Sequence, residues 1–193
     1  MSTTTTTHGI AEQQALMIEQ LRTVHAMKAA ALRMFDPMLR AVEAEQRNPD
    51  MAEVVDLLDN MLGAFGEHRT QTAAHERALL RRLEQLDRRP LGRLARGAAA
   101  AGAAARARLG AIGGQNHGAN ARDAFVYEHL EIALLELLER LATRAGDVET
   151  ARVAHACLVD DRAMAAKITR NWENVLSLAL ASKRIPSRRP DDG

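Results

Sequence analysis

Helix-breaking residues divide this chain into a few long stretches, and their spacing constrains the fold more than any other feature. The breaks lie at Asn48-Pro49, at Arg89-Pro90, in the glycine-rich stretch 110–120 and at Gly146-Asp147. Proline disfavours helical backbone in the residue before it, and glycine favours the end of a helix. Between the breaks, apolar residues recur every three or four positions, which is the period of an amphipathic α-helix. No stretch shows the alternation typical of a β-strand.

The sequence therefore predicts four long helices and one short one. The long helices are expected at about 12–46, 50–86, 120–144 and 147–182, and a short, alanine-rich helix at about 91–109. Four amphipathic helices can each bury an apolar face by packing as a bundle. We predict an all-α fold, a four-helix bundle with one short extra crossover helix, in a single domain of residues 12–182. Residues 1–11 and 183–193 are polar and are expected to form disordered tails.

The composition agrees with helices and excludes several classes of protein. Hydrophobic residues make up 47% of the chain but aromatic residues only 3%, and alanine and leucine are strong helix formers. The net charge of +1 gives no general reason to expect nucleic-acid binding. The single cysteine, Cys157, cannot form an internal disulfide. Since neither an apolar run of membrane-spanning length nor a secretory signal is found, we expect a cytoplasmic protein with no membrane partner.

Each long helix brings a polar residue to its apolar face, near its middle. Helical projection places Lys28, His68, Thr72, His75 (or Glu76) and Asp161 in the apolar stripes of three helices. On the fourth, the apolar face is expected to centre on Leu130, Leu134, Leu137 and Leu141, with Glu131 at its edge and Glu128 beside it. Burying an unpaired charge costs several kcal/mol, so these groups must contact one another, a metal ion or water. The alternative is that each reaches solvent at a boundary, which is hardest for the short Asp161 side chain.

Two stretches of this sequence resemble a known family. They are ANARDAFVYEHLEIALLELLERLATRAGDVETA, followed at its spacing by DDRAMAAKIT, and FGEHRTQTAAHERALLRRLEQLDRRP. Both are similar to the stress-associated YciE/YciF-type ferritin-like proteins, and the likeness covers roughly residues 21–176. The resemblance implies a ferritin-like fold, metal binding and often a dimer, in a family whose biochemical role is largely unassigned.

The ligand pattern that the resemblance implies is only partly present. Glu128-His129-x-Glu131 keeps the family pattern, and Asp160-Asp161 stand where glutamates are usual. Thr70 and Gln71 replace a pair of glutamates, and Lys28 stands about where a further glutamate is expected. The candidate metal ligands are thus Glu128, Glu131, Asp161, His68 and His75.

Lys28 leads to the functional hypothesis. A two-metal centre of this kind wants about six ligands, and an ammonium group near the carboxylates would repel a metal ion and pair with them itself. We expect that Lys28 has replaced the metal and forms a buried ion pair with Asp161 and with Glu128 or Glu131. This leaves no cofactor and a non-catalytic, stress-associated structural or interaction protein. The alternatives are a site for one Fe, Mn or Zn ion, or an intact dinuclear centre in a redox or metal-storage protein.

Two features bear on partners. The apolar residues of ALLELL exceed one stripe and favour a homodimer. From Arg88 to Arg122 there are seven arginines and no acidic residue, which favours an acidic partner for this segment. Aromatic residues do not alternate with these arginines, so nucleic acid is not expected.

Overall fold

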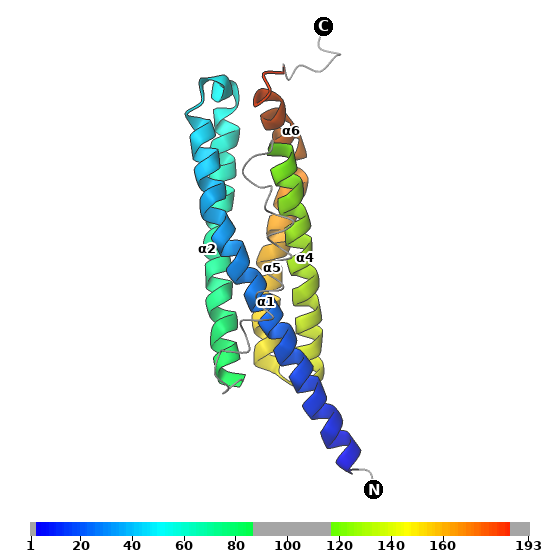
Figure 1. Cartoon of the computed structure of the whole chain (residues 1–193). Coiled ribbons are helices and arrows are strands. Elements are labelled where there is room, and N and C mark those ends of the chain that lie inside the picture. The colour runs from blue at the N-terminus through cyan, green and yellow to red at the C-terminus, as the bar shows by residue number, and fades with distance from the viewer. Residues whose placement is uncertain (1–2, 87–116, 186–193) are drawn as a thin grey trace.

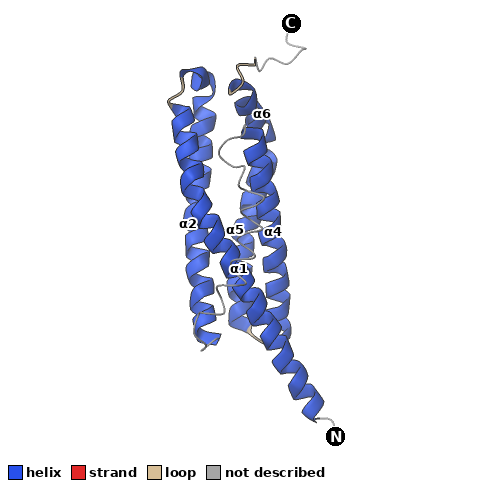
Figure 2. Cartoon of the chain, in the orientation of Figure 1, coloured by secondary structure: helices blue, strands red, loops and turns tan. Residues whose placement is uncertain are grey.

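The computed structural model describes residues 3–86 and 117–185, and the elements in these ranges are all helical (Figures 1 and 2). In chain order they are α1 (Thr3–Gln46), the short 3-10 helix η1 (Pro49–Val54), α2 (Val55–Leu86), α4 (His117–Arg144), α5 (Val148–Arg170) and α6 (Trp172–Ala181). The all-α prediction is therefore confirmed for the described ranges. The short helix predicted at about 91–109 lies outside them, as do residues 186–193 of the predicted C-terminal tail.

The long helices lie side by side as two antiparallel pairs (Figure 1). α1 packs along α2, and α4 packs along α5, while α1 also contacts α4 and α2 contacts α5. α2 ends at the opposite end of the molecule from the start of α4, so these two helices run in the same direction. α6 continues α5 toward the end that holds the α1–α2 turn.

Both predicted turns form through local sequence chemistry. The Asn48 side chain accepts a hydrogen bond from the Asp50 backbone N–H and caps η1, which begins at Pro49. At the α4–α5 turn, Gly146 has a φ of 71°, a left-handed conformation that glycine adopts without strain. The next residue, Asp147, accepts from the Thr150 N–H as the cap of α5. These turns fold each pair of helices into a hairpin.

Three boundaries differ from the prediction. α1 begins at Thr3, so residues 3–11 continue the helix where a tail was predicted. α4 begins at His117, about one turn before the predicted start. The predicted helix 147–182 is divided in two at Asn171, whose backbone leaves the helical region at φ −113° and ψ 18°. The Asn171 side chain donates to the Lys167 carbonyl at 2.7 Å, because asparagine competes for backbone groups inside a helix.

The core is apolar toward both ends and polar in the middle. Toward the α4–α5 turn the largest apolar cluster includes Leu21, Leu79, Leu135 and Leu158. Toward the α1–α2 turn a smaller cluster contains Val42, Met51, Leu58 and Leu178. Most of the buried polar residues lie between them: Lys28, His68, Thr72, His75, Glu128, Glu131 and Asp161. Within the described residues, no helix is long and apolar enough to cross a membrane.

The inner face predicted for α4 was wrong, because the helix is rotated about its own axis relative to the prediction. Leu130 and Leu137 are 39% and 48% exposed, whereas Leu135 and Leu138 are fully buried. The buried stripe instead runs through Glu128, Glu131, Leu135, Leu138 and Ala142. Since leucines occupy both faces of this segment, apolarity alone did not distinguish them. The rotation turns both glutamates into the core.

Candidate functional site

Lys28 of α1 lies at the centre of the polar region with no exposed surface. Its Nζ donates to both carboxylate oxygens of Asp161 on α5, at 2.7 Å each. It also donates to Glu131 Oε2 on α4, at 3.1 Å. One ammonium group thereby joins three helices. Charged hydrogen bonds at such distances are among the stronger ones in proteins.

A second pair adjoins the first. His68 Nε2 of α2 lies 2.9 Å from Glu128 Oε1 on α4, and both residues are buried. The ring of Phe35 packs edge-on against the imidazole, with ring centroids 5.6 Å apart. Ligand atoms of His68, Glu128, Glu131 and Asp161 all lie within 4.8 Å of one another. This buried His/Glu/Glu/Asp cluster could hold a metal ion.

His75, the remaining predicted ligand, lies outside this group of four. Its Nε2 is 2.9 Å from Asp160 Oδ2, and its Nδ1 is 3.9 Å from Asp161 Oδ1. Sequence reasoning had noted Asp160 as a counterpart of a family glutamate but had not paired it with His75. The contact between His25 and Glu76, at 2.9 Å, was also missed. A histidine and a carboxylate on different helices carry no mutual signal in sequence, so these pairs required the tertiary structure.

The surroundings shift the protonation equilibria of the cluster. Burial by itself would lower the pKa of Lys28, but the carboxylates of Glu131 and Asp161 outweigh it and raise that pKa, so the ammonium form is held. Burial raises the pKa of Glu131 against the opposing effect of Lys28. Burial also opposes the charged form of His68, but the hydrogen bond to Glu128 prevails and raises the His68 pKa. Lys28 thus keeps its charge, and the raised pKa of Glu131, about 8, favours the neutral form of that carboxyl group, so both changes reduce the net negative charge of the cluster.

Some buried polar atoms of the region have no hydrogen-bond partner in the described structure. They include Glu128 Oε2, Glu131 Oε1 and Thr72 Oγ1. The two glutamates and His68 also border a cavity of about 40 Å³, which has room for water-sized molecules. An unpaired buried oxygen is costly, so these two carboxylate oxygens are the natural acceptors for a small donor or cation.

The residues present do not fit two metal ions. The ferritin-like dinuclear arrangement uses four carboxylates and two histidines drawn from four helices. Here three carboxylates and one histidine converge, and the position between Asp161 and Glu131 is taken by the Lys28 ammonium. One ion on the side of Glu128 Oε2 and Glu131 Oε1 fits the donor set better, because those oxygens are unpaired.

Comparison with known proteins gives one positive finding. No curated protein and no solved structure matches the chain. Residues 12–181 match a family described as a domain of unknown function, DUF892. The match covers α1 from residue 12 onward, the other long helices and the polar cluster. The chain therefore belongs to the DUF892 family, which is the YciF-like ferritin-like family.

Proposed function

We propose that this protein is a ferritin-like four-helix bundle with a degenerate metal site, acting as a non-catalytic, stress-associated structural or interaction protein in the cytoplasm. In this proposal Lys28 supplies the positive charge that a metal ion supplies in a metal-binding bundle. The stress association rests on the resemblance of the sequence to YciE/YciF-type proteins.

The helix arrangement supports the ferritin-like part of the proposal. The helices α1 and α2 form one antiparallel hairpin, and α4 and α5 form the other. Because α2 and α4 run in the same direction, the chain has to return along the length of the bundle between them. One long crossover in a four-helix bundle is the ferritin-like connectivity. The short crossover helix belongs to residues outside the described ranges and remains a prediction.

The contact between Lys28 and Asp161 carries the functional proposal. Asp161 is fully buried, and both of its oxygens accept from the same Nζ at 2.7 Å. A carboxylate engaged in this way has to lose its ammonium partner before it can bridge metal ions. Removing that partner leaves a charge without compensation, which is strongly unfavourable in a protein interior.

One observation favours a second candidate, a site for one Fe, Mn or Zn ion in a redox or metal-storage protein. Glu128 Oε2 and Glu131 Oε1 are buried without partners, and the imidazole of His68 is within reach of both residues. Imidazole suits iron and zinc, and carboxylates suit manganese. In this candidate Lys28 would remain in place and limit the site to a single ion.

Metal content of the gently purified protein, followed by titration with Fe(II), Mn(II) and Zn(II), distinguishes the candidates. The degenerate site predicts no stoichiometric metal, no saturable uptake and no change on chelation. One equivalent per chain would favour the mononuclear candidate, and two would overturn both.

The variant Lys28→Glu sharpens this experiment. It removes the ammonium and adds a fourth carboxylate, so we expect it to gain saturable Mn(II) or Fe(II) binding. Lys183→Glu changes charge equally on an exposed turn and serves as the control. If the folded Lys28→Glu protein binds no more metal than the control, Lys28 is not what excludes the ion.

We also propose a second copy of this chain as the partner. Val126, Leu130, Ala133 and Leu137 form an exposed stripe on α4 with four–three–four spacing, which is the seam of paired helices. The acidic partner suggested for Arg88–Arg122 remains a proposal from sequence, because residues 87–116 lie outside the described ranges. Nucleic acid and membrane remain unexpected as partners.

A further inference from the structure

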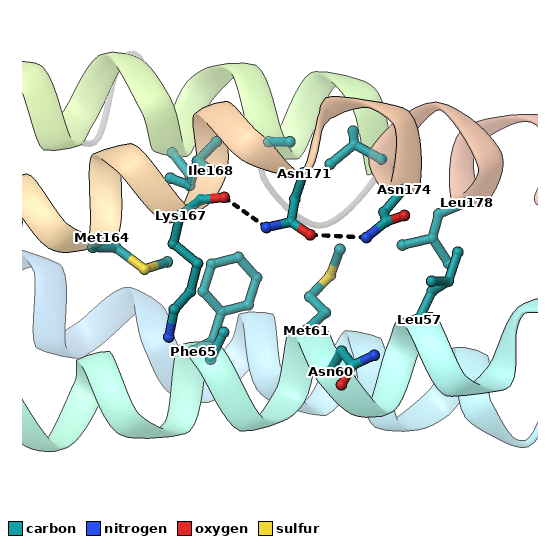
Figure 3. A pocket seen from close by; sticks show the side chains of 14 residues that line it. Leu57, Asn60, Met61, Phe65, Met164, Lys167, Ile168, Asn171, Asn174 and Leu178 are labelled. Carbon is teal, nitrogen blue, oxygen red and sulfur yellow. Dashed lines mark hydrogen bonds between the residues drawn. The ribbon is translucent and has the colours of Figure 1, made fainter.

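A cavity of about 370 Å³, open to solvent on one side, lies between α2 and the helices α4, α5 and α6, and none of the residues of the polar cluster lines it. Its walls are apolar and include Leu57, Met61, Phe65, Ile168, Val175 and Leu178 (Figure 3). A large apolar cavity of this kind is the usual form of a small-molecule site.

The volume sets the size of the ligand. A cavity of about 150 Å³ lined by apolar side chains holds a benzene molecule. By that scale, 370 Å³ has room for roughly 15 non-hydrogen atoms. A straight-chain acid of ten to twelve carbons is of this size.

The polar residues of the lining determine which head group the ligand can carry. Asn60, Asn171, Asn174 and Lys167 line the cavity, and Lys167 is the one charged residue among the described lining residues. Asn171 and Asn174 are occupied with each other through a 2.8 Å hydrogen bond. Lys167 is paired with Glu67 at 3.1 Å, but both side chains are about half-exposed, at 42% and 60%. Such a solvated pair is worth little, so Lys167 is available to another anion.

The charged residue and the apolar residues Leu57 and Leu178 lie at opposite ends of the cavity. In Figure 3 the Lys167 amine extends toward α2 beside Phe65, whereas Leu57 and Leu178 lie at the other end of the cavity. Asn60 and Asn174 are exposed, so solvent reaches the rim. A ligand with a negative head at Lys167 can therefore place its chain along the apolar wall toward Leu178.

We propose that this cavity binds a medium-chain carboxylate, a saturated fatty acid of about ten to twelve carbons, with its carboxylate at Lys167 and its tail toward Leu57 and Leu178. The site is independent of the polar cluster, and its occupancy does not require that cluster to bind or to lack a metal. The recognition is built from apolar volume and one cation, so it selects for chain length and head charge.

Isothermal titration calorimetry of the full chain with decanoate, below its micelle-forming concentration, tests the proposal. We expect saturable binding of one decanoate per chain. Decyltrimethylammonium, with the same tail and the opposite charge, is expected to bind at least tenfold more weakly. Octadecanoate is expected to bind more weakly than decanoate because the cavity is too short for it.

Two variants test the two halves of the site. Lys167→Gln is expected to weaken decanoate binding about five- to tenfold, while the matched exposed variant Lys183→Gln leaves it unchanged. Ala64→Leu, which fills the cavity from α2, is expected to abolish binding in a protein whose circular dichroism confirms the fold. The proposal is overturned if decanoate shows no saturable binding, if the cationic amphiphile binds equally well, or if Lys167→Gln and Lys183→Gln behave alike.

Discussion

Lys28 differs from the other two lysines of the chain in having no exposed surface and three charged hydrogen bonds. Lys167 makes one such contact at the surface, and Lys183 is exposed. A buried ion pair contributes little net stability when intact, because burial of the charges offsets their attraction. Removal of one partner lowers the stability strongly, since the remaining charge stays buried without a counterion.

The first prediction concerns that asymmetry. Lys28→Met keeps the side-chain length and removes the charge, leaving Asp161 and Glu131 without their common donor. We expect the free energy of unfolding to fall by about 3–5 kcal/mol in urea denaturation. Lys167→Met, at a half-exposed pair, should cost no more than about 1 kcal/mol.

A double variant checks the cause. Lys28→Met combined with Asp161→Asn removes both charges, so its loss should be smaller than the sum of the two single losses. Additive losses would mean that the two side chains do not act as a pair.

The second prediction concerns pH. Burial and the charge of Lys28 lower the pKa of His75 below its usual 6.5, against the opposing effects of Asp160 and Asp161. The neutral imidazole is therefore favoured in the folded state. The stability due to His75 is complete above pH 6.5 and is lost as the pH falls through the lowered folded-state pKa.

Comparison with His75→Gln isolates this contribution. We expect the stability advantage of the unmodified protein over His75→Gln to shrink between pH 7.5 and pH 5, measured by urea unfolding at each pH. His155→Gln, at an exposed position, should track the unmodified protein across the same range. An advantage that grows on acidification would contradict the depressed pKa.

At the scale of elements, the α4–α5 turn orders the hairpin that carries both glutamates and Asp161. The Asp147 carboxylate caps α5 through the Thr150 N–H and accepts two bonds of 2.7 Å from Arg82 of α2. These bonds lower the pKa of Asp147 although partial burial opposes them. The Asp147 carboxylate thus caps α5 and also binds the α4–α5 hairpin to α2.

The third prediction is that Asp147→Ala lowers the free energy of unfolding by about 1–2 kcal/mol, seen as a lower Tm in calorimetry. Asp147→Asn keeps an oxygen that can cap the helix but loses the charge that faces Arg82. Its loss should be intermediate. Equal effects of the two substitutions would assign the whole contribution to the Arg82 pair and none to the cap.

At the scale of the whole molecule, the rotation of α4 has two consequences. It turns Glu128 and Glu131 inward and places Leu130 and Leu137 on the surface. The exposed leucines are the basis for the proposed second copy. Both consequences come from one helix having two apolar faces.

The fourth prediction tests the dimer. Leu130→Glu combined with Leu137→Glu is expected to convert a dimer to a monomer in light scattering coupled to size exclusion, with the helical content unchanged. Val148→Glu, at a position that is 78% exposed beyond the α4 stripe, should leave the dimer intact. A protein that is monomeric without any substitution would refute the proposed assembly.

Within the described residues, the sequence by itself determined the long helices and the turns between them, apart from the start of α1 and the break at Asn171, because these elements depend on neighbouring residues. Asn48-Pro49 and Gly146-Asp147 act within a few positions, and apolar spacing shows where each long helix lies. It also placed Lys28 and Asp161 in apolar stripes, since on those helices only one face is apolar.

The ion pair of Lys28 with Asp161 and Glu131 was expected from the sequence and is present. Only the tertiary structure decided how the histidines pair: the contact of His68 with Glu128 joins residues 60 positions apart, and no local rule connects them. The rotation of α4 was decided in the same way, because either face could have been buried until the neighbouring helices were in place. The cavity between α2 and α6 likewise arises from packing between helices, which the spacing of residues along one helix does not specify.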